Sequence, residues 1–515
     1  MQRRIPLLGL ALAIIALLLP IPTGVAASAT PPAASAIAWS PCQDNPGFDC
    51  GTVSVPIDWN RRNGPRIDLA LARHKATDPA ARVGSLLINP GGPGGSGVDF
   101  VMARPNWLSD ELHRRFDIVG FDPRGVARSH PIVCSGEALN RTPYLVPANA
   151  AQFEALRVAI TDLRADCRAR TGPLYDQVNT LNVVRDLDAI RAALGEEKLT
   201  FYGVSYGTLL GQQYAEMYPR RVRALALDSN VDHSLDMKEF FDTEAVAAQD
   251  SFNEFANWCA RSQSCALHEQ GVRAVWTRLL AKADRGELRN PEFPDIPVTA
   301  LSLISEAHLR FYGPQWEFLA QLLVDLDNGA ALPPGVLAPY QNGEVAAFPF
   351  PILCQDFDLR ARGYSEYAGH LRRSARLAPD MRYGPLAATL APICLAQPTP
   401  IPNPQRPTRV RDSFPLLLGT ALHDPATPYE WTAGLARQLG PYARVLTYEG
   451  WGHGVYGWSD CTTGTFDAYL ISRTLPPRGK RCEAVSPASG LTARLPQPPP
   501  AHIPTPILPG WPSLF

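Results

Sequence analysis

Short apolar segments alternate with helical patterns through the first half of this chain. Four mostly apolar runs, each typical of a buried strand, occupy residues 83–89, 116–121, 198–204 and 222–227. Two earlier segments, 51–57 and 66–74, alternate apolar and polar residues, as strands with one exposed face do. Between 181 and 194, apolar residues recur every three or four positions, which predicts a helix. This order of elements predicts an α/β domain with a doubly wound, mostly parallel sheet.

The strand–helix rhythm stops after Asp228 and resumes near Pro415. The intervening helical candidates occupy residues 236–260, 272–285, 299–311 and 314–326. Strands return at 415–421 and 443–448, and helices follow them at 429–439 and 463–472. We therefore expect one core built from residues 39–230 and 400–482. A helical cap, residues 231–399, is expected to be inserted after the sixth core strand.

Neither end of the chain is expected to belong to this core. Arg3 and Arg4 precede an apolar run followed by small residues, the pattern of a secretory signal peptide over residues 1–29. A permanent membrane anchor is the alternative, but the run is short for a span and contains prolines. We expect a secreted or cell-envelope protein with no membrane span after signal removal. Residues 483–515 form a proline-rich tail that either wraps the surface or is disordered.

The overall composition narrows the classes of partner. With 515 residues, 45% of them hydrophobic, the chain can bury a large core. Its net charge of −1 gives no sign of the basic surface that nucleic-acid binding needs. We therefore expect no nucleic-acid partner, and nothing in the sequence predicts the oligomeric state.

All ten cysteines follow the predicted signal peptide, and an exported chain forms disulfides by default. Short loops are the cheapest to close, so we expect cysteines to pair with their sequence neighbours. The expected pairs are Cys42–Cys50, Cys134–Cys167, Cys259–Cys265, Cys354–Cys394 and Cys461–Cys482. Since no cysteine pair has zinc-ligand spacing with partner histidines, we expect neither a metal site nor a cofactor.

The run 198–204 leads directly into Gly203-Val204-Ser205-Tyr206-Gly207, a Gly-x-Ser-x-Gly pattern before a helix. A serine on such a sharp strand-to-helix turn presents its hydroxyl above the sheet edge, where it can act as a nucleophile. The pattern also occurs by chance, and Ser205 could then be a helix-cap serine. The rest of the sequence must decide between these two interpretations.

A serine nucleophile needs a general base and an acid that orients the base. Asp424 follows the strand 415–421, and His453 follows the strand 443–448. The order serine, acid, histidine at the ends of successive strands is that of the nucleophile-elbow hydrolases. Taken alone, Asp424 could cap the next helix and His453 could be an exposed loop residue. Their joint order predicts a triad, with Thr427 as a support for Asp424 or as a turn residue.

The glycine-rich turn Gly91-Gly92-Pro93-Gly94 follows the early strand 83–89. Phosphate-binding loops are also rich in glycine, but no following Lys-Ser/Thr or dinucleotide pattern is present. At this place a nucleophile-elbow hydrolase has one backbone donor for the oxyanion. We expect the amide of Gly92, or of Gly91, to act together with that of Tyr206.

These motifs together resemble those of the secreted bacterial tripeptidyl aminopeptidases, in the prolyl-aminopeptidase branch of the α/β-hydrolases. The matching segments are residues 89–97, 120–125, 202–208, 424–428 and 452–454. The resemblance implies an α/β-hydrolase fold with a helical cap over the active site. It also implies release of short peptides, often tripeptides, from the free N-termini of peptides or proteins. The triad roles carry over to Ser205, Asp424 and His453 by motif.

An aminopeptidase needs an acidic group to pair with the α-ammonium group of its substrate. The cap supplies the candidates, of which Asp356 is the first choice and Glu306 another. Pro90 stands where many prolyl aminopeptidases have histidine, which argues against proline-specific cleavage. A secreted carboxylesterase or lipase-like enzyme with the same triad is the main alternative. A non-catalytic binding protein is a weaker one, because no triad member is missing.

Overall fold

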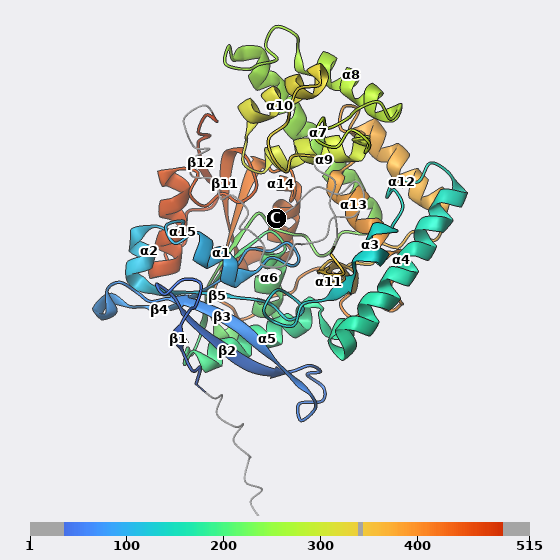
Figure 1. The fold of residues 1–515 in the computed structure, drawn as a ribbon. Coiled ribbons are helices and arrows are strands. Elements are labelled where there is room, and N and C mark those ends of the chain that lie inside the picture. Colours follow the sequence, from blue (N-terminus) through green and yellow to red (C-terminus); the bar gives the residue numbers. More distant parts are fainter. Residues whose placement is uncertain (1–35, 338–342, 488–515) are drawn as a thin grey trace, which may run out of the picture. The chain divides into compact units, whose positions relative to one another are not determined.

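In this computed structural model, which describes residues 36–337 and 343–487, a ten-stranded sheet forms the centre of the protein (Figure 1). The strand order is β1-β2-β3-β5-β4-β7-β8-β10-β11-β12. The strands are β1 Ser40–Pro41, β2 Asp49–Pro56, β3 Arg66–His74, β4 Gly84–Asn89, β5 Phe116–Phe121, β7 Leu199–Val204, β8 Val222–Asp228, β10 Leu416–His423, β11 Ala443–Trp451 and β12 Lys480–Cys482. From β5 to β12 the neighbours are parallel, whereas β1, β2 and β3 are antiparallel. The predicted α/β class and mostly parallel sheet are confirmed.

Helices pack against both faces of the sheet, which therefore separates two hydrophobic cores. The flanking helices are α1 Gly97–Ala103, α2 Asp110–Arg115, α5 Thr180–Ala193, α6 Gly207–Met217, α14 Tyr429–Leu439 and α15 Asp460–Ser472. Buried residues of α1, α2 and α15 belong to one core, and those of α5, α6 and α14 to the other. Strands β4, β7, β8, β10 and β11 consequently end together at one edge, between the two helical layers.

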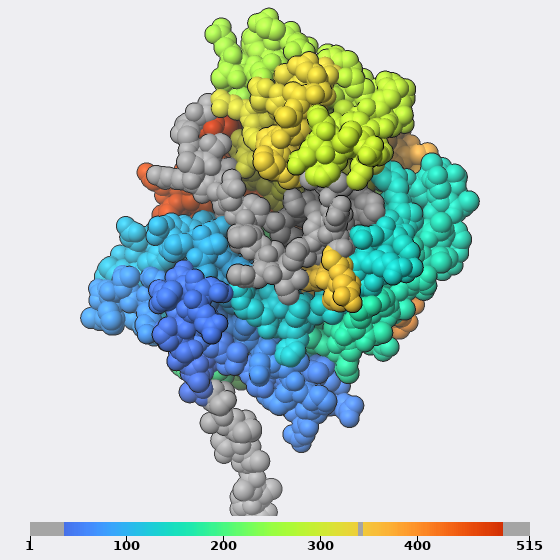
Figure 2. Space-filling view, in the orientation of Figure 1, coloured from blue at the N-terminus to red at the C-terminus, as the bar shows by residue number. Residues whose placement is uncertain are grey.

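The regular elements between β8 and β10 are helices apart from one short strand, in agreement with the predicted helical insertion. They are α7 Met237–Arg261, α8 Val272–Asp284, α9 Ala300–Phe311, α10 Trp316–Asn328, β9 Val345–Ala347, α11 Pro351–Asp356, α12 Tyr364–Leu377 and α13 Pro385–Ile393. In Figures 1 and 2, α8 and α10 lie at the top, coloured yellow-green to yellow. The exact limits of the cap, residues 231–399, remain a prediction.

A segment that precedes β7 also joins this helical layer, an arrangement that was not predicted from the sequence. It contains β6 Val133–Ser135, α3 Gly136–Asn140 and the 22-residue helix α4 Ala150–Thr171. β6 pairs with β9, and α4 packs against α12 and α13. The signal was present: Phe153, Leu156, Ile160 and Leu163 recur at helical spacing and are buried.

The ten cysteines form five disulfides, each between sequence neighbours. The Cys134–Cys167 bond ties β6 to α4, and Cys354–Cys394 ties α11 to the end of α13. Among the described residues no helix combines the length and the apolar character that a membrane span requires. The predicted signal peptide, residues 1–29, lies outside the described residues, as does most of the predicted tail.

Candidate active site

Ser205 lies on a strained turn between β7 and α6. Its φ of 57° is in the left-handed region, which residues other than glycine seldom adopt. A Cβ on Gly203 would lie 2.6 Å from the carbonyl oxygen of Gly207, and one on Gly207 would lie 2.6 Å from Asn89 Oδ1. Both glycines of the pattern are therefore required by close backbone approach, as in a nucleophile elbow. Sequence and geometry agree on the turn.

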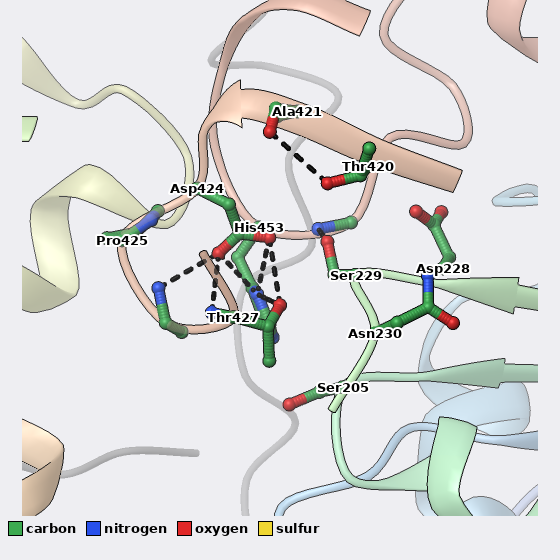
Figure 3. Close-up of polar contacts among 12 residues, drawn as sticks. Ser205, Asp228, Ser229, Asn230, Thr420, Ala421, Asp424, Pro425, Thr427 and His453 are labelled. Atoms are coloured by element: carbon green, nitrogen blue, oxygen red, sulfur yellow. Dashed lines mark hydrogen bonds and ion pairs between the residues drawn. The ribbon is translucent and has the colours of Figure 1, made fainter. Parts of the chain in front are cut away.

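Asp424 and His453 lie close together after β10 and β11 (Figure 3). His453 Nδ1 is 3.0 Å from Asp424 Oδ1 and 3.2 Å from Oδ2. Asp424 Oδ1 also accepts hydrogen bonds from the amides of Ala426 and Thr427, at 2.9 Å each. The Thr427 hydroxyl donates to Oδ2 at 3.0 Å. These contacts hold the carboxylate against the imidazole.

The environment of Asp424 favours its charged form. Burial opposes ionisation of this fully buried carboxyl, but the adjacent His453, the Ser229 hydroxyl and the Thr427 amide outweigh burial and lower the pKa of Asp424. A carboxylate at Nδ1 fixes that nitrogen as the N–H donor, which leaves Nε2 free to accept a proton. The pair can therefore serve as an oriented general base.

The Ser205 hydroxyl points into the same space in Figure 3, below the Asp424–His453 pair. The side chains of Ser205 and His453, both among the described residues, do not form a hydrogen bond with each other in this structure. Such bonds in enzymes without substrate are often long and tighten when substrate binds. The backbone of His453 is fixed from the cap side, since its amide donates to the carbonyl of Tyr312 at 2.8 Å.

The amides of Gly91 and Gly92, in the turn after β4, differ in their hydrogen bonds. The Gly91 amide donates to Asn89 Oδ1 at 3.0 Å and is therefore engaged. Among the described residues, the amides of Gly92 and Tyr206 have no acceptor, so both are available to bind an oxyanion. A Cβ on Gly91 would lie 2.4 Å from the carbonyl oxygen of Val204, so only glycine brings the turn this close. Of the two predicted glycines, Gly92 fits the donor role.

Ser205 and His453 line a cavity of about 1190 Å³. This is larger than the roughly 300–1,000 Å³ of ordinary small-ligand pockets. Its apolar lining comes from both parts of the fold. Inserted-segment residues and α14 supply Phe240, Leu353, Phe357, Leu386, Leu390 and Trp431, and the core supplies Phe100, Trp107, Tyr202 and Trp458. Polar lining residues include Arg104, Ser109, Arg310 and Asp460. The site can hold an extended substrate several residues long.

The two acids predicted to bind the substrate amine do not line this cavity. Asp356 is fully buried and accepts hydrogen bonds from protein groups through both carboxylate oxygens. Glu306 is also buried and forms an ion pair with Arg310 one helical turn away. Because both carboxylates are engaged by protein groups and neither lines the cavity, the geometry does not fit the predicted role.

Three further residues position the site and were not predicted. The Ser229 hydroxyl accepts from the Gly454 amide at 2.7 Å, and Ser229 itself has a φ of 59°. Asp228, at the end of β8, accepts from the amides of Val455 and Tyr456 at 2.9 Å each. Tyr312, described above, packs its ring against that of His453. Only the strand-end position of Asp228 was visible in the sequence.

Two buried titratable residues of the predicted cap, His308 and Glu244, lie next to the loop that carries Asp424. His308 Nε2 hydrogen-bonds the carbonyl oxygen of Pro425 at 2.9 Å and lies 3.6 Å from Glu244 Oε1. Burial lowers the pKa of His308 to about 4 and raises that of Glu244 to about 8. Both groups are therefore neutral at pH 7, and their contact carries no net charge.

Replacing Glu244 with glutamine is expected to remove a pH dependence of stability. From the ordinary pKa of 4.5 up to about 8, the folded state holds a proton that the unfolded state has lost. The free energy of unfolding of the wild type therefore falls as pH rises, by about 1.4 kcal/mol per pH unit from this group. Denaturant unfolding at pH 5.5 and 7.5 measures the difference. Glu239→Gln, at an exposed position of the same helix, is the control, and identical pH slopes for wild type and Glu244→Gln would contradict the assignment.

Comparison with known proteins agrees with this geometry. The sequence of residues 84–460 matches the family described as alpha/beta hydrolase fold. The chain is 34% identical to serine protease Hip1 of Mycobacterium tuberculosis, over 93% of this chain and 98% of that protein. It is 31% identical to carboxylesterase B of the same species, over 84% and 86% of the two chains. It is 30% identical to the tripeptidyl aminopeptidase of Streptomyces lividans, over 89% of each. The resemblance to tripeptidyl aminopeptidases is confirmed.

Proposed function

This chain belongs to the α/β-hydrolase family, and we propose that it is a secreted peptidase that releases short peptides, tripeptides among them, from free N-termini. Its relatives include enzymes named serine protease and tripeptidyl aminopeptidase, and it is a serine hydrolase of this kind. The observation that carries the proposal is the contact of His453 with Asp424 in the cavity that Ser205 also lines. The five disulfides support an oxidising, extracytoplasmic location.

In the proposed mechanism, His453 Nε2 takes the proton of Ser205 as its Oγ attacks the substrate carbonyl. The amides of Gly92 and Tyr206 bind the oxyanion of the tetrahedral intermediate. Asp424 stabilises the imidazolium, which then protonates the leaving amine as the C–N bond breaks. Water, deprotonated by His453, attacks the acyl-enzyme and releases the peptide with Ser205 in its original form.

A residue other than Asp356 or Glu306 must bind the substrate amine. Among the residues that the structure describes, two acids line the cavity, Asp99 and Asp460, and Asp99 forms an ion pair with Arg128. Asp460 is exposed at the start of α15, and its carboxylate makes no ion pair or hydrogen bond with any described residue. We propose Asp460 as the partner of the substrate ammonium group, in place of Asp356 and Glu306.

A tripeptide reporter with a free N-terminus is expected to be cleaved at least about 10-fold faster, in kcat/KM, than its N-acetylated form. Acetylation removes the positive charge, and a charge-assisted contact contributes roughly 1.5–3 kcal/mol. Asp460→Asn is expected to raise KM for the free peptide and to leave the acetylated one unchanged. Steady-state hydrolysis of the two fluorogenic peptides by both proteins provides the measurement.

Equal rates on both peptides, together with fast hydrolysis of short-chain aryl esters, would instead support a carboxylesterase. That alternative is kept because one relative bears that name and the apolar cavity wall suits an acyl chain. We also propose that residues 39–230 and 400–482 form the core and that residues 231–399 form the cap. In this arrangement, the cap covers the cavity and restricts the length of the substrate.

A further inference from the structure

Asp356, at the C-terminal end of α11, is the centre of a buried hydrogen-bond network. Its Oδ2 accepts from the phenol of Tyr206 at 2.6 Å and from the hydroxyl of Thr180 at 2.6 Å. Its Oδ1 accepts from the Thr180 amide at 2.9 Å and from Asn403 Nδ2 at 2.7 Å. The carboxylate thus joins the inserted helices to the nucleophile elbow, to the start of α5 and to the chain before β10.

No cation neutralises this carboxylate among the residues that the structure describes. His233 Nε2 hydrogen-bonds the backbone carbonyl of Asp356 at 2.7 Å, but burial lowers the pKa of His233 and keeps the ring uncharged. Burial raises the pKa of Asp356, and the hydrogen bonds from Thr180, Tyr206 and Asn403 oppose that rise by stabilising the charged form. Removing any one donor leaves a buried acceptor partly unsatisfied, which is costly in a dry interior.

The phenol of Tyr206 is consequently fixed in place. Burial and the Asp356 carboxylate raise the pKa of Tyr206 well above its usual value, so the hydroxyl remains a donor. The same residue, directly after Ser205, carries the backbone amide proposed for the oxyanion. Tyr206 has helical φ and ψ immediately before α6, and a ring held at its hydroxyl restrains the Cα of the turn that carries this amide. An amide that is already in place needs no reorganisation during the reaction.

We propose that Asp356 is a positioning residue that, through the Tyr206 phenol, fixes the oxyanion amide of Tyr206. The inserted helical region would then contribute to catalysis itself, besides covering the cavity. The Cys354–Cys394 disulfide ties α11 to the end of α13 and fixes the base from which Asp356 acts. This inference rests on the proposed function, because it requires Ser205 to be the nucleophile.

Tyr206→Phe is the direct test, because it removes one hydroxyl and keeps the ring. The control is Tyr367→Phe, at another buried phenol, on α12, that donates to the carbonyl of Leu145 at 3.1 Å. We expect Tyr206→Phe to lower kcat about 10-fold with KM little changed, part of the roughly 10²–10³-fold effect of losing an oxyanion donor. A peptide aldehyde, which forms a tetrahedral adduct, should bind more weakly by the same factor. Tyr367→Phe should change thermal stability only.

A double-mutant cycle with Asp356→Asn tests the connection between the two residues. If Asp356 acts through Tyr206, the two substitutions together should lower kcat by much less than the product of their separate effects. Wild-type kcat and wild-type aldehyde affinity in Tyr206→Phe would overturn the inference, even if Asp356→Asn fails to fold. Labelling of wild-type Ser205 by an aryl phosphonate separates this outcome from failure of the proposed function: an unlabelled Ser205 contradicts both, and a labelled one leaves only the inference at stake.

Discussion

Ser205→Ala is expected to lower kcat/KM for peptide reporters by at least about 10⁴-fold. The substitution removes the oxygen that forms the acyl-enzyme and leaves the oxyanion amides and the cavity in place. What activity remains should come from binding and oxyanion stabilisation of attack by water. Steady-state kinetics of the purified variant, compared with the wild type at equal concentration, measures the effect.

The fold of this variant should be unchanged. Ser205 Oγ makes no hydrogen bond with any described residue, and alanine keeps the Cβ on the strained turn. Its melting temperature should therefore lie within a few degrees of the wild-type value. A correctly folded Ser205→Ala protein with wild-type turnover would show that another residue is the nucleophile.

Asp424→Asn is expected to have the second-largest effect, a fall in kcat of about 10⁴-fold. The neutral amide can still accept from the amides of Ala426 and Thr427 through its oxygen. It cannot stabilise the imidazolium of His453, and its NH₂ group favours the wrong tautomer of the ring. The variant should therefore bind substrate normally and fail in the proton transfer.

Asp412→Asn provides the matched control, because Asp412 is an exposed aspartate ahead of β10. This change should leave kcat and KM as in the wild type. A large loss in Asp412→Asn, together with a small one in Asp424→Asn, would mean that the acid has been assigned to the wrong aspartate.

Much of the core could be predicted because each local signal agrees with the global fold. The predicted strand 116–121 coincides with β5, and 222–227 differs from β8 by one residue. A buried parallel strand needs a continuous apolar run, and that run is visible in sequence. The Gly-x-Ser-x-Gly turn was equally visible, since close backbone approach requires both of its glycines.

The predicted amine-binding residues illustrate why the rest of the site could not be predicted. An acid near a disulfide in an apolar stretch, such as Asp356, can face a substrate or be satisfied internally. Its donors Thr180, Tyr206 and Asn403 come from three distant parts of the chain, so only the tertiary structure reveals them. The sequence also could not distinguish Gly91 from Gly92, because the difference is a local hydrogen bond from the Gly91 amide to the Asn89 side chain, which depends on the conformation of the turn.

The central claim is that Ser205 forms a covalent acyl-enzyme, and mass spectrometry of the phosphonate-treated wild-type protein tests it most directly. An aryl phosphonate ester should inactivate the wild type with one adduct per chain, located on the peptide that contains Ser205. Ser205→Ala should give no adduct under the same conditions. Full inactivation with the adduct on another residue, or peptide hydrolysis that persists while Ser205 is fully modified, would contradict the account.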